Sequence, residues 1–410
     1  MPRRASSHSP AQPELIVTQP ADLAACLEHL DVEQVLAFDT EFVGEDSYRP
    51  DLCLVQVATS ERLYIIDPFT CGPLDAFWRM LLDPAKTVVV HAGREDVRIC
   101  HFAIGAVPPR LFDVQIAAGL IGLNYPIGYA GAVFELLGKR MHKSETLTDW
   151  RRRPLTPNQL RYAFDDVRYL IPAYERLLDR LRRLEREDWA NEEFATFSRR
   201  ALGEEAAIEK WRKIKGIGSL DRRGLAIARE IYRWREEQAE RVDRPPRTLL
   251  RDDLLTEIAR RAPGRLDELR TLRGFSSGVG EPILEAVRRG NELSSEDLPE
   301  LVERENDSQN VLMLANLLGV VLSNLCAKRE LASTLTATGQ DLKAIVRSRV
   351  AREPLPEINL TRGWRAAAVL PELLAVLDGE QAVRVVKPRS AAPLGYATPS
   401  PKDEKPGSGA

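Results

Sequence analysis

Two acidic residues stand two positions apart in the apolar segment Val35–Val43, which reads VLAFDTEFV. The residues around Asp39 and Glu41 are mostly β-branched, aliphatic or aromatic, which is typical of a buried strand. Side chains two apart on a strand leave from the same face, so both carboxylates would point one way. Burying two like charges is costly, and a divalent cation is the usual compensation. The alternative is a strand that ends at Phe38, followed by a solvated loop.

Asp96 is a third acid in a position suited to chemistry. The segment Val88–Asp96 reads VVVHAGRED, which predicts a strand, a glycine turn and the first turn of a helix. Asp96 would then lie near the C-terminal end of a strand, where open α/β sheets bind their ligands. The helix dipole alone also favours an acid in a first turn, so this position by itself does not require a ligand.

Tyr162 and Asp166 lie four residues apart in a predicted long helix and therefore share one of its faces. The helix is expected to begin at Pro157, because Thr156 and Gln159 have the spacing of a capping box. A tyrosine and an aspartate at this spacing are usually a simple hydrogen-bonded pair, so the pattern gains weight only together with the other acids.

In this order, Asp-x-Glu, a later Asp and Tyr-x-x-x-Asp resemble the DEDD exonuclease superfamily, and the tyrosine resembles its DEDDy branch. The resemblance to ribonuclease D covers about residues 30–185. It extends to motifs beyond the acids, namely Leu54-Val-Gln-Val57, Ile66-Asp-Pro68, His91-Ala-Gly-x-Glu-Asp96, Phe112-Asp113, Lys143-Ser-Glu-x-x-x-Asp-Trp150 and Arg153-Pro-Leu-Thr-x-x-Gln159.

The resemblance implies an α/β fold with a ribonuclease H-like mixed sheet and two Mg²⁺ or Mn²⁺ ions as cofactors. It implies that Asp39 bridges both ions, that Glu41 and Asp166 complete the site of the ion bearing the nucleophile, and that Asp96 holds the other. Hard cations prefer such oxygen ligands, and two of them can activate water and stabilise charge on a phosphate. Tyr162 would orient the attacking water, since a phenol of pKa near 10 is a poor base.

Five further residues are candidates for contacting the substrate. A basic or polar side chain could bind phosphate, and tryptophan could contact a base, but each also has a structural interpretation: a satisfied histidine, core packing or a solvated basic face. They are Gln56, whose facing is undetermined, and His91, Lys143, Trp150 and Arg151.

Strand and helix patterns alternate between about residues 14 and 190, and a hairpin followed by βα units predicts a mixed sheet with helices packed on it. Pro172 is expected to kink the long helix or divide it. Expected strands are Val35–Phe38, Leu52–Ala58, Leu63–Ile66 and Thr87–His91, and expected helices are Ala21–Leu30, Leu74–Leu82, Glu95–Phe102, Val114–Leu120 and Tyr129–Leu137.

The pattern after residue 205 is all-helical, without convincing strands. Residues 206–290 resemble an HRDC domain, a helical module that accompanies ribonuclease D, and 296–378 are HRDC-like mainly by position. The predicted domains are therefore a disordered leader (1–13), an exonuclease domain (14–190), these two helical domains, and a disordered tail (388–410). Basic residues that would grip single-stranded RNA, or form solvated faces, are Lys213, Lys215, Arg222, Arg223, Arg247 and Arg251.

Composition fits a globular protein of two or three domains: 410 residues, 44% hydrophobic, 29% charged and a net charge of -3. The net charge does not favour nucleic acid, although arginines cluster locally. Five scattered cysteines without CxxC spacing fit a reducing cytoplasm rather than a disulfide framework or a zinc site. No apolar run is expected to reach the roughly 18 residues of a membrane span, and the N-terminus lacks the apolar stretch of a secretory signal.

The leading hypothesis is a cytoplasmic, metal-dependent 3′→5′ exoribonuclease that trims RNA precursors, tRNA in particular, and releases nucleoside 5′-monophosphates. RNA is the expected partner, with neither a membrane nor an obligate protein partner. The four acids fit a 3′→5′ DNA exonuclease of proofreading or repair type equally well; the absence of polymerase or helicase motifs argues against it. A non-catalytic RNA-binding scaffold is the third hypothesis, but it would be expected to have lost acids that this chain keeps.

Overall fold

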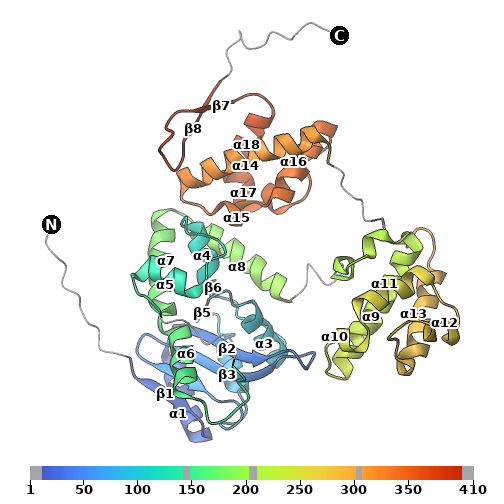
Figure 1. Cartoon of the computed structure of the whole chain (residues 1–410). Coiled ribbons are helices and arrows are strands. Elements are labelled where there is room, and N and C mark those ends of the chain that lie inside the picture. Colours follow the sequence, from blue (N-terminus) through green and yellow to red (C-terminus); the bar gives the residue numbers. More distant parts are fainter. Residues whose placement is uncertain (1–11, 142–147, 203–209, 302–306, 399–410) are drawn as a thin grey trace.

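The computed structural model describes residues 12–141, 148–202, 210–301 and 307–398, and the chain begins with an α/β domain (Figure 1). Its mixed sheet has six strands in the order β1-β4-β3-β2-β5-β6, as the pattern of hairpin and βα units predicted. The strand with both acids, β2, is central, antiparallel to β3 and parallel to β5. The strands are β1 (Glu14–Val17), β2 (Val35–Val43), β3 (Asp51–Ala58), β4 (Leu63–Ile66), β5 (Thr87–Val90) and β6 (Leu111–Asp113).

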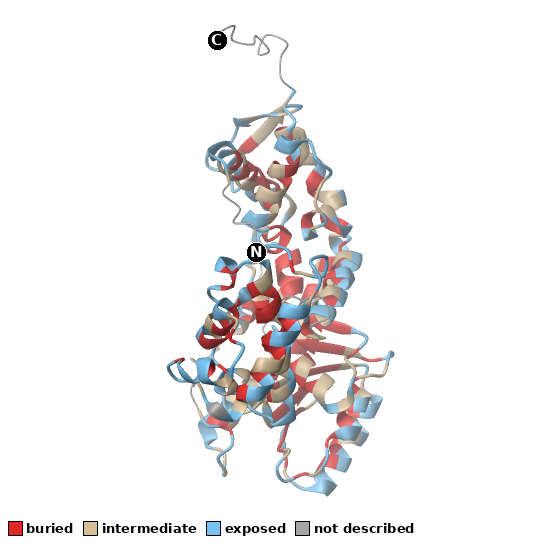
Figure 2. Ribbon diagram, turned by 90° about the vertical axis from the view of Figure 1, so that its right-hand side faces the viewer, coloured by how far each residue is buried: buried red, intermediate tan, exposed pale blue. Residues whose placement is uncertain are grey.

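Helices cover both faces of this sheet, and the buried residues concentrate between the layers (Figure 2). Because side chains alternate along a strand, Phe38 packs into one hydrophobic cluster and Ala37 into the other. One face is covered by α1 (Pro20–Val32), α2 (Asp75–Met80) and α3 (Arg94–Ile104). The other is covered by α4 (Val114–Leu120), α5 (Tyr129–Leu137), α6 (Pro157–Arg168), α7 (Leu170–Arg183) and α8 (Glu187–Leu202).

Two expectations about these elements need refinement. β2 does not end at Phe38 but continues to Val43, so both acids belong to the strand. The long helix is divided at Tyr169, and Pro172 lies in the first turn of α7, where a backbone N–H has no intrahelical partner in any case. The short strands β1 and β6 were not expected.

The middle helical unit has a hydrophobic cluster of its own. It touches the exonuclease domain through Asp243, whose carboxylate accepts hydrogen bonds from the backbone N–H groups of Tyr48 and Arg49, and through an ion pair of Arg49 with Glu240. Its elements are the 3₁₀ turns η1 (Lys210–Lys213), η2 (Ile217–Ser219) and η3 (Ser277–Val279) and the helices α9 (Arg222–Arg241), α10 (Pro246–Leu249), α11 (Asp252–Arg261), α12 (Leu266–Arg270) and α13 (Gly280–Glu292).

The last helical unit, in contrast, shares one continuous hydrophobic cluster with the α4–α8 side of the exonuclease domain. Trp364 stacks on Trp189 with ring centroids 4.8 Å apart, and Arg365 forms a buried ion pair with Glu193. This unit comprises α14 (Gln309–Arg329), α15 (Ser333–Thr336), α16 (Gly339–Ala351), η4 (Asn359–Thr361), α17 (Gly363–Ala368), α18 (Leu370–Leu377), β7 (Ala382–Val385) and β8 (Leu394–Ala397).

The expected disordered tail is wrong for its first part, and strands do occur after residue 205. β8 pairs with β7, and Leu394 is buried with its backbone N–H donated to Asn324 of α14. The small and polar residues of this segment give no strand pattern in the sequence. They nevertheless form a two-stranded sheet that the buried Asn324 side chain holds in place. Residues 1–11 and 399–410 lie outside the described part.

Among the described helices, α14 is long and apolar enough to cross a membrane by length and composition alone. Much of its apolar window is nevertheless buried against neighbouring elements of the chain, as expected for the central helix of a helical domain. The five cysteines are buried and free, in line with the absence of a disulfide framework.

Candidate active site

Asp39 and Glu41 leave β2 on the face that α6 and α7 cover. Asp39 is directly opposite Gln56 of β3 in the antiparallel ladder, and the register shifts by one residue just after Glu41. Such a bulge bends a strand and re-aims the side chains beside it. Asp39 and Glu41 precede this shift and leave one face of β2, as the sequence predicted.

α6 brings Asp166 to the same place. The capping box predicted at its start is present: the Thr156 hydroxyl accepts the N–H of Gln159, and the Gln159 side chain accepts the N–H of Thr156. The helix packs on β2, β3 and β4. Carboxylate oxygens of Asp39, Glu41 and Asp166 all lie within 4.8 Å of one another.

Asp96 lies in the first turn of α3, as predicted, and only 7% of it is exposed. Its carboxylate accepts a hydrogen bond from the Thr40 hydroxyl, which leaves β2 on the opposite face from Asp39 and Glu41. Asp96 is not part of the three-carboxylate cluster, yet its charge is among the causes that raise the pKa of Asp39.

The electrostatics of the site follow from burial and crowding. Burial first, and then the neighbouring carboxylates, raise the pKa of Asp39 well above its usual range and that of Glu41 to about 8. Burial likewise raises the pKa of Asp166 to about 7 and that of Asp96 to about 6. The charges of Asp96, Asp166 and Glu41 all raise the pKa of Asp39, so the carboxylates of the site repel one another.

These residues fit a divalent metal ion. Three partly buried carboxylates offer the oxygen ligands that Mg²⁺ and Mn²⁺ prefer, and the Oδ2 atom of Asp166 has no hydrogen-bond partner among the described residues. An orphaned buried acceptor costs free energy unless a ligand or water engages it. A cation here would lower the cost of both the repulsion and the unpaired oxygen.

Tyr162 lies one helical turn before Asp166, with its ring 5.9 Å from that of Trp150. Burial, followed by the charges of Asp166, Glu41 and Asp39, raises the pKa of the Tyr162 phenol above its usual value. The hydroxyl therefore keeps its proton near neutral pH, which suits a group that donates a hydrogen bond rather than one that removes a proton.

The residues predicted to contact the substrate differ in burial and in their partners. Gln56 is completely buried on the face of Asp39, and Trp150 is core-packed. Arg151 is exposed and pairs with Asp149 and Asp46. His91 contacts the ring of Tyr129, and burial lowers the pKa of its imidazole to about 4. Lys143 lies outside the described residues.

Four of the six basic residues expected to grip RNA are engaged within the middle unit. The guanidinium groups of Arg222 and Arg223 donate to backbone carbonyls near its end. Arg247 and Arg251 form ion pairs with Asp252 and Asp253, whereas Lys213 and Lys215 are exposed.

Three residues that hold the site in place were not among the predicted site residues, although Asp113 was part of a quoted motif. Thr40 binds Asp96, Asp113 binds the turn before Asp96, and the Tyr129 hydroxyl accepts the N–H of Tyr169 between α6 and α7. Only Asp113 carried a sequence signal, because it directly precedes a predicted helix, where an aspartate caps well.

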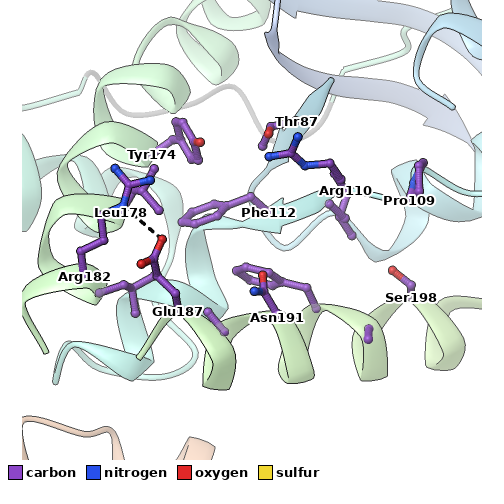
Figure 3. Close-up of a pocket in the computed structure, with 15 residues that line it drawn as sticks. Thr87, Pro109, Arg110, Phe112, Tyr174, Leu178, Arg182, Glu187, Asn191 and Ser198 are labelled. Carbon is purple, nitrogen blue, oxygen red and sulfur yellow. Dashed lines mark hydrogen bonds and ion pairs between the residues drawn. The ribbon is translucent and has the colours of Figure 1, made fainter. Parts of the chain in front are cut away.

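A sizeable cavity lies elsewhere, at the amino ends of β5 and β6 (Figure 3). Its volume is about 370 Å³, and Thr87, Phe112, Tyr174 and Asn191 are among the residues that line it. None of the five predicted catalytic residues does so. Cavity size therefore does not identify the carboxylate site, which is marked by charge and burial instead.

Comparisons with known proteins bear on the family of the chain. The profile of the 3′-5′ exonuclease family matches residues 15–182, and that of the HRDC domain matches 224–287. The chain is 36% identical to ribonuclease D of Gluconacetobacter diazotrophicus, over 90% of this chain and 94% of that protein. It is 34% identical to ribonuclease D of Acidiphilium cryptum, over 92% and 96%. The crystal structure of Escherichia coli RNase D, an exoribonuclease involved in structured RNA processing, superposes with a TM-score of 0.75 and 29% identity, covering 88% of this chain and 98% of that one.

Proposed function

This chain belongs to the ribonuclease D family and is a metal-dependent 3′→5′ exoribonuclease, and we propose that its substrates are RNA precursors with 3′ extensions, tRNA precursors in particular. The E. coli relative acts in structured RNA processing, which supports a substrate that combines a folded body with a single-stranded 3′ end. The expected products are nucleoside 5′-monophosphates. We place the enzyme in the cytoplasm, in accord with its buried free thiols.

The proposed catalytic set is Asp39, Glu41, Asp96, Tyr162 and Asp166. The observation that carries it is the convergence of carboxylate oxygens of Asp39, Glu41 and Asp166 within 4.8 Å of one another. These three would hold one Mg²⁺ or Mn²⁺ ion. Asp39 and Asp96, which lies beside the cluster, would hold a second.

The bound ions would supply a nucleophilic water near neutral pH and stabilise the charge that develops on the scissile phosphate. The protein's own groups supply orientation. The Tyr162 hydroxyl, protonated and one turn from Asp166, would fix the attacking water by a hydrogen bond. Thr40 holds the Asp96 carboxylate in one orientation, so that this ligand is set before substrate arrives.

We further propose that the middle HRDC unit, 206–290, guides single-stranded RNA. Lys213 and Lys215 are its best candidates for contacting phosphate, because both are exposed while Arg222 and Arg223 are bound to backbone carbonyls. The exonuclease domain expected at 14–190 extends through α8 to Leu202, and the last unit expected at 296–378 extends through β8 to Ala397. The last unit packs too closely on the exonuclease domain to act as a separate arm.

The test compares 5′-labelled RNA and DNA strands of equal sequence, and a tRNA with a 3′ extension, in the presence of Mg²⁺, Mn²⁺ or EDTA. We expect a metal-dependent descending ladder on RNA that stops near the mature tRNA end and disappears in Asp39→Asn. A ladder unchanged in Asp39→Asn would refute the site. Faster digestion of DNA would favour a role in DNA repair, and metal-dependent RNA digestion that ignores the tRNA body would refute the proposed substrate.

A further inference from the structure

Gln56 is a polar side chain buried at the site that both the described hydrogen bonds and the catalytic proposal leave unexplained. It is 0% exposed, and neither its Nε2 nor its Oε1 has a hydrogen-bond partner among the described residues. An unpaired buried amide is costly, and such groups are rare in folded proteins unless water or a ligand engages them. Leucine or methionine would fill the same space without this cost.

The sheet register fixes where the Gln56 side chain points. Gln56 is directly opposite Asp39 on one side and Ile65 of β4 on the other, so all three side chains leave on the same face of the sheet. Directly opposed residues have Cβ atoms roughly 4.5–5.5 Å apart. The amide therefore lies beside the carboxylate that is proposed to bridge both ions.

α6 covers this part of the sheet. It packs on both β2 and β3, and it carries Asp166, whose Oδ2 is likewise buried without a partner in the described chain. The Gln56 amide, with two donor hydrogens and one acceptor oxygen, thus lies under the helix that carries the Asp166 oxygen without a donor. The amide NH₂ can supply the donor that the carboxylate oxygen lacks.

We propose that Gln56 is a positioning residue of the metal site: its NH₂ group donates to the carboxylates of Asp39 and Asp166 through one ordered water, and so fixes their orientation toward the ions. The inference rests on the proposed function, because it assigns Gln56 to that same site. Outer hydrogen-bond partners of this kind orient metal ligands and raise metal affinity. The residue is not a catalytic residue, since it acts through the carboxylates.

The decisive variant is Gln56→Met, which keeps the approximate shape and removes every hydrogen-bonding atom. Without metal, its melting temperature should stay close to that of the wild type, because the loss of hydrogen bonds to the carboxylates is offset by the removed cost of burying an amide. At saturating RNA, kcat should fall about tenfold or more, with KM for RNA within about threefold of the wild type. The Mn²⁺ concentration that gives half of the metal-induced rise in melting temperature, measured without RNA, should increase by a similar factor.

Ile65→Val provides the matched control, since it alters packing on the other cross-strand neighbour of Gln56 and changes no polar group. It should lower the melting temperature slightly and leave kcat and the Mn²⁺ titration unchanged. Should Gln56→Met not fold, Gln56→Asn serves instead: the amide is one methylene shorter, and the same losses are expected.

Asp39→Asn in the same series separates this inference from the proposed function. Loss of activity in Asp39→Asn together with wild-type kcat and Mn²⁺ titration in the Gln56 variant would overturn the role of Gln56 alone. Activity retained in Asp39→Asn would overturn the proposed site itself. Equal losses in Gln56→Met and Ile65→Val would reduce Gln56 to a packing residue and also overturn the inference.

Discussion

The carboxylate of Asp113 accepts a hydrogen bond from the backbone N–H of Gly93, with 3.1 Å between Oδ2 and N. Its other oxygen caps α4 by accepting the N–H groups of Gln115 and Ile116. One completely buried side chain at the end of β6 therefore fixes the beginnings of two helices. Because Asp96 is three residues beyond Gly93, its place at the site depends on this turn.

Gly93→Ala should displace that turn. A Cβ atom at Gly93 would lie 2.5 Å from the Cβ of Val90, which is buried in the sheet and cannot move aside. We expect the free energy of unfolding to fall by about 1–3 kcal/mol. We also expect kcat to fall under conditions in which the variant is fully folded, because Asp96 is displaced. Urea unfolding and single-turnover kinetics measure the two effects. Gly128→Ala, where an added Cβ meets nothing within 4 Å, is the control; wild-type kcat in Gly93→Ala would contradict the argument.

Stability of the metal-free enzyme should depend on pH in an unusual direction. Folding raises the pKa of Glu41 to about 8 and that of Asp166 to about 7, above ordinary unfolded-state values near 4. The unfolded chain therefore releases these protons first, and the stability present at low pH is lost progressively as pH rises from about 4 to about 8.

Urea unfolding in EDTA at pH 5–9 should show this decline. Saturating Mg²⁺ should abolish or reverse it, since metal binding requires the deprotonated carboxylates. A flat profile in EDTA would show that the carboxylates are not crowded as described.

Asp166→Asn should separate function from stability. Removing one of several like charges relieves repulsion, so the metal-free melting temperature should rise, while RNA digestion should fall on the order of 10²–10³-fold or more. Calorimetry and ladder assays on one preparation measure both. Asp165→Asn is the matched control, because Asp165 pairs with Arg168 outside the cluster; equal loss of activity in both variants would argue against the assignment.

Glu193→Ala should destabilise the junction of the exonuclease domain and the last helical unit. The Glu193 carboxylate pairs with the buried Arg365 and accepts the indole N–H of Trp364. Leaving the guanidinium buried without a counter-charge, with only the carbonyls of Thr336 and Leu335 as acceptors, should cost about 3–5 kcal/mol. Glu187→Ala removes an exposed pair with Arg182 and should cost less than about 1 kcal/mol. Chemical denaturation decides, and similar small values for both would contradict a buried ion pair.

Asp243→Ala should release the middle unit without unfolding it. Its carboxylate is exposed, so stability should change by less than about 1 kcal/mol. The radius of gyration from small-angle X-ray scattering should nevertheless increase, because Asp243 and Glu240 are the described polar contacts to residues 48–49. Asp253→Ala, which loses an ion pair inside the unit, should leave it unchanged.

Local patterns predicted what local physics determines. Val114–Leu120 and Tyr129–Leu137 begin and end where the apolar pattern predicted, and the capping box starts α6. The mixed sheet was also predictable, because a hairpin and βα units restrict how strands combine. The edge strand β6 has only three residues, too few to show a period, whereas β1 is as long as the predicted β4 and β5 and was missed all the same.

The roles of individual polar residues were less accessible, because they depend on packing between distant segments. Trp150 lies in the core rather than being free for a base, and Arg151 pairs with Asp46 about a hundred positions earlier in the chain. The shared core with α14–α18 also joins residues separated by more than a hundred positions. No sequence period reports such a contact.

That shared core has a consequence for how the enzyme is made. Strands near the start of the chain and helices beyond residue 307 belong to one hydrophobic cluster, with the whole HRDC unit between them. A ribosome delivers the chain from the N-terminus, so the outer layer of the nuclease stays incomplete until its last helices emerge. The middle unit has a hydrophobic core of its own, so it can fold before the nuclease domain is complete.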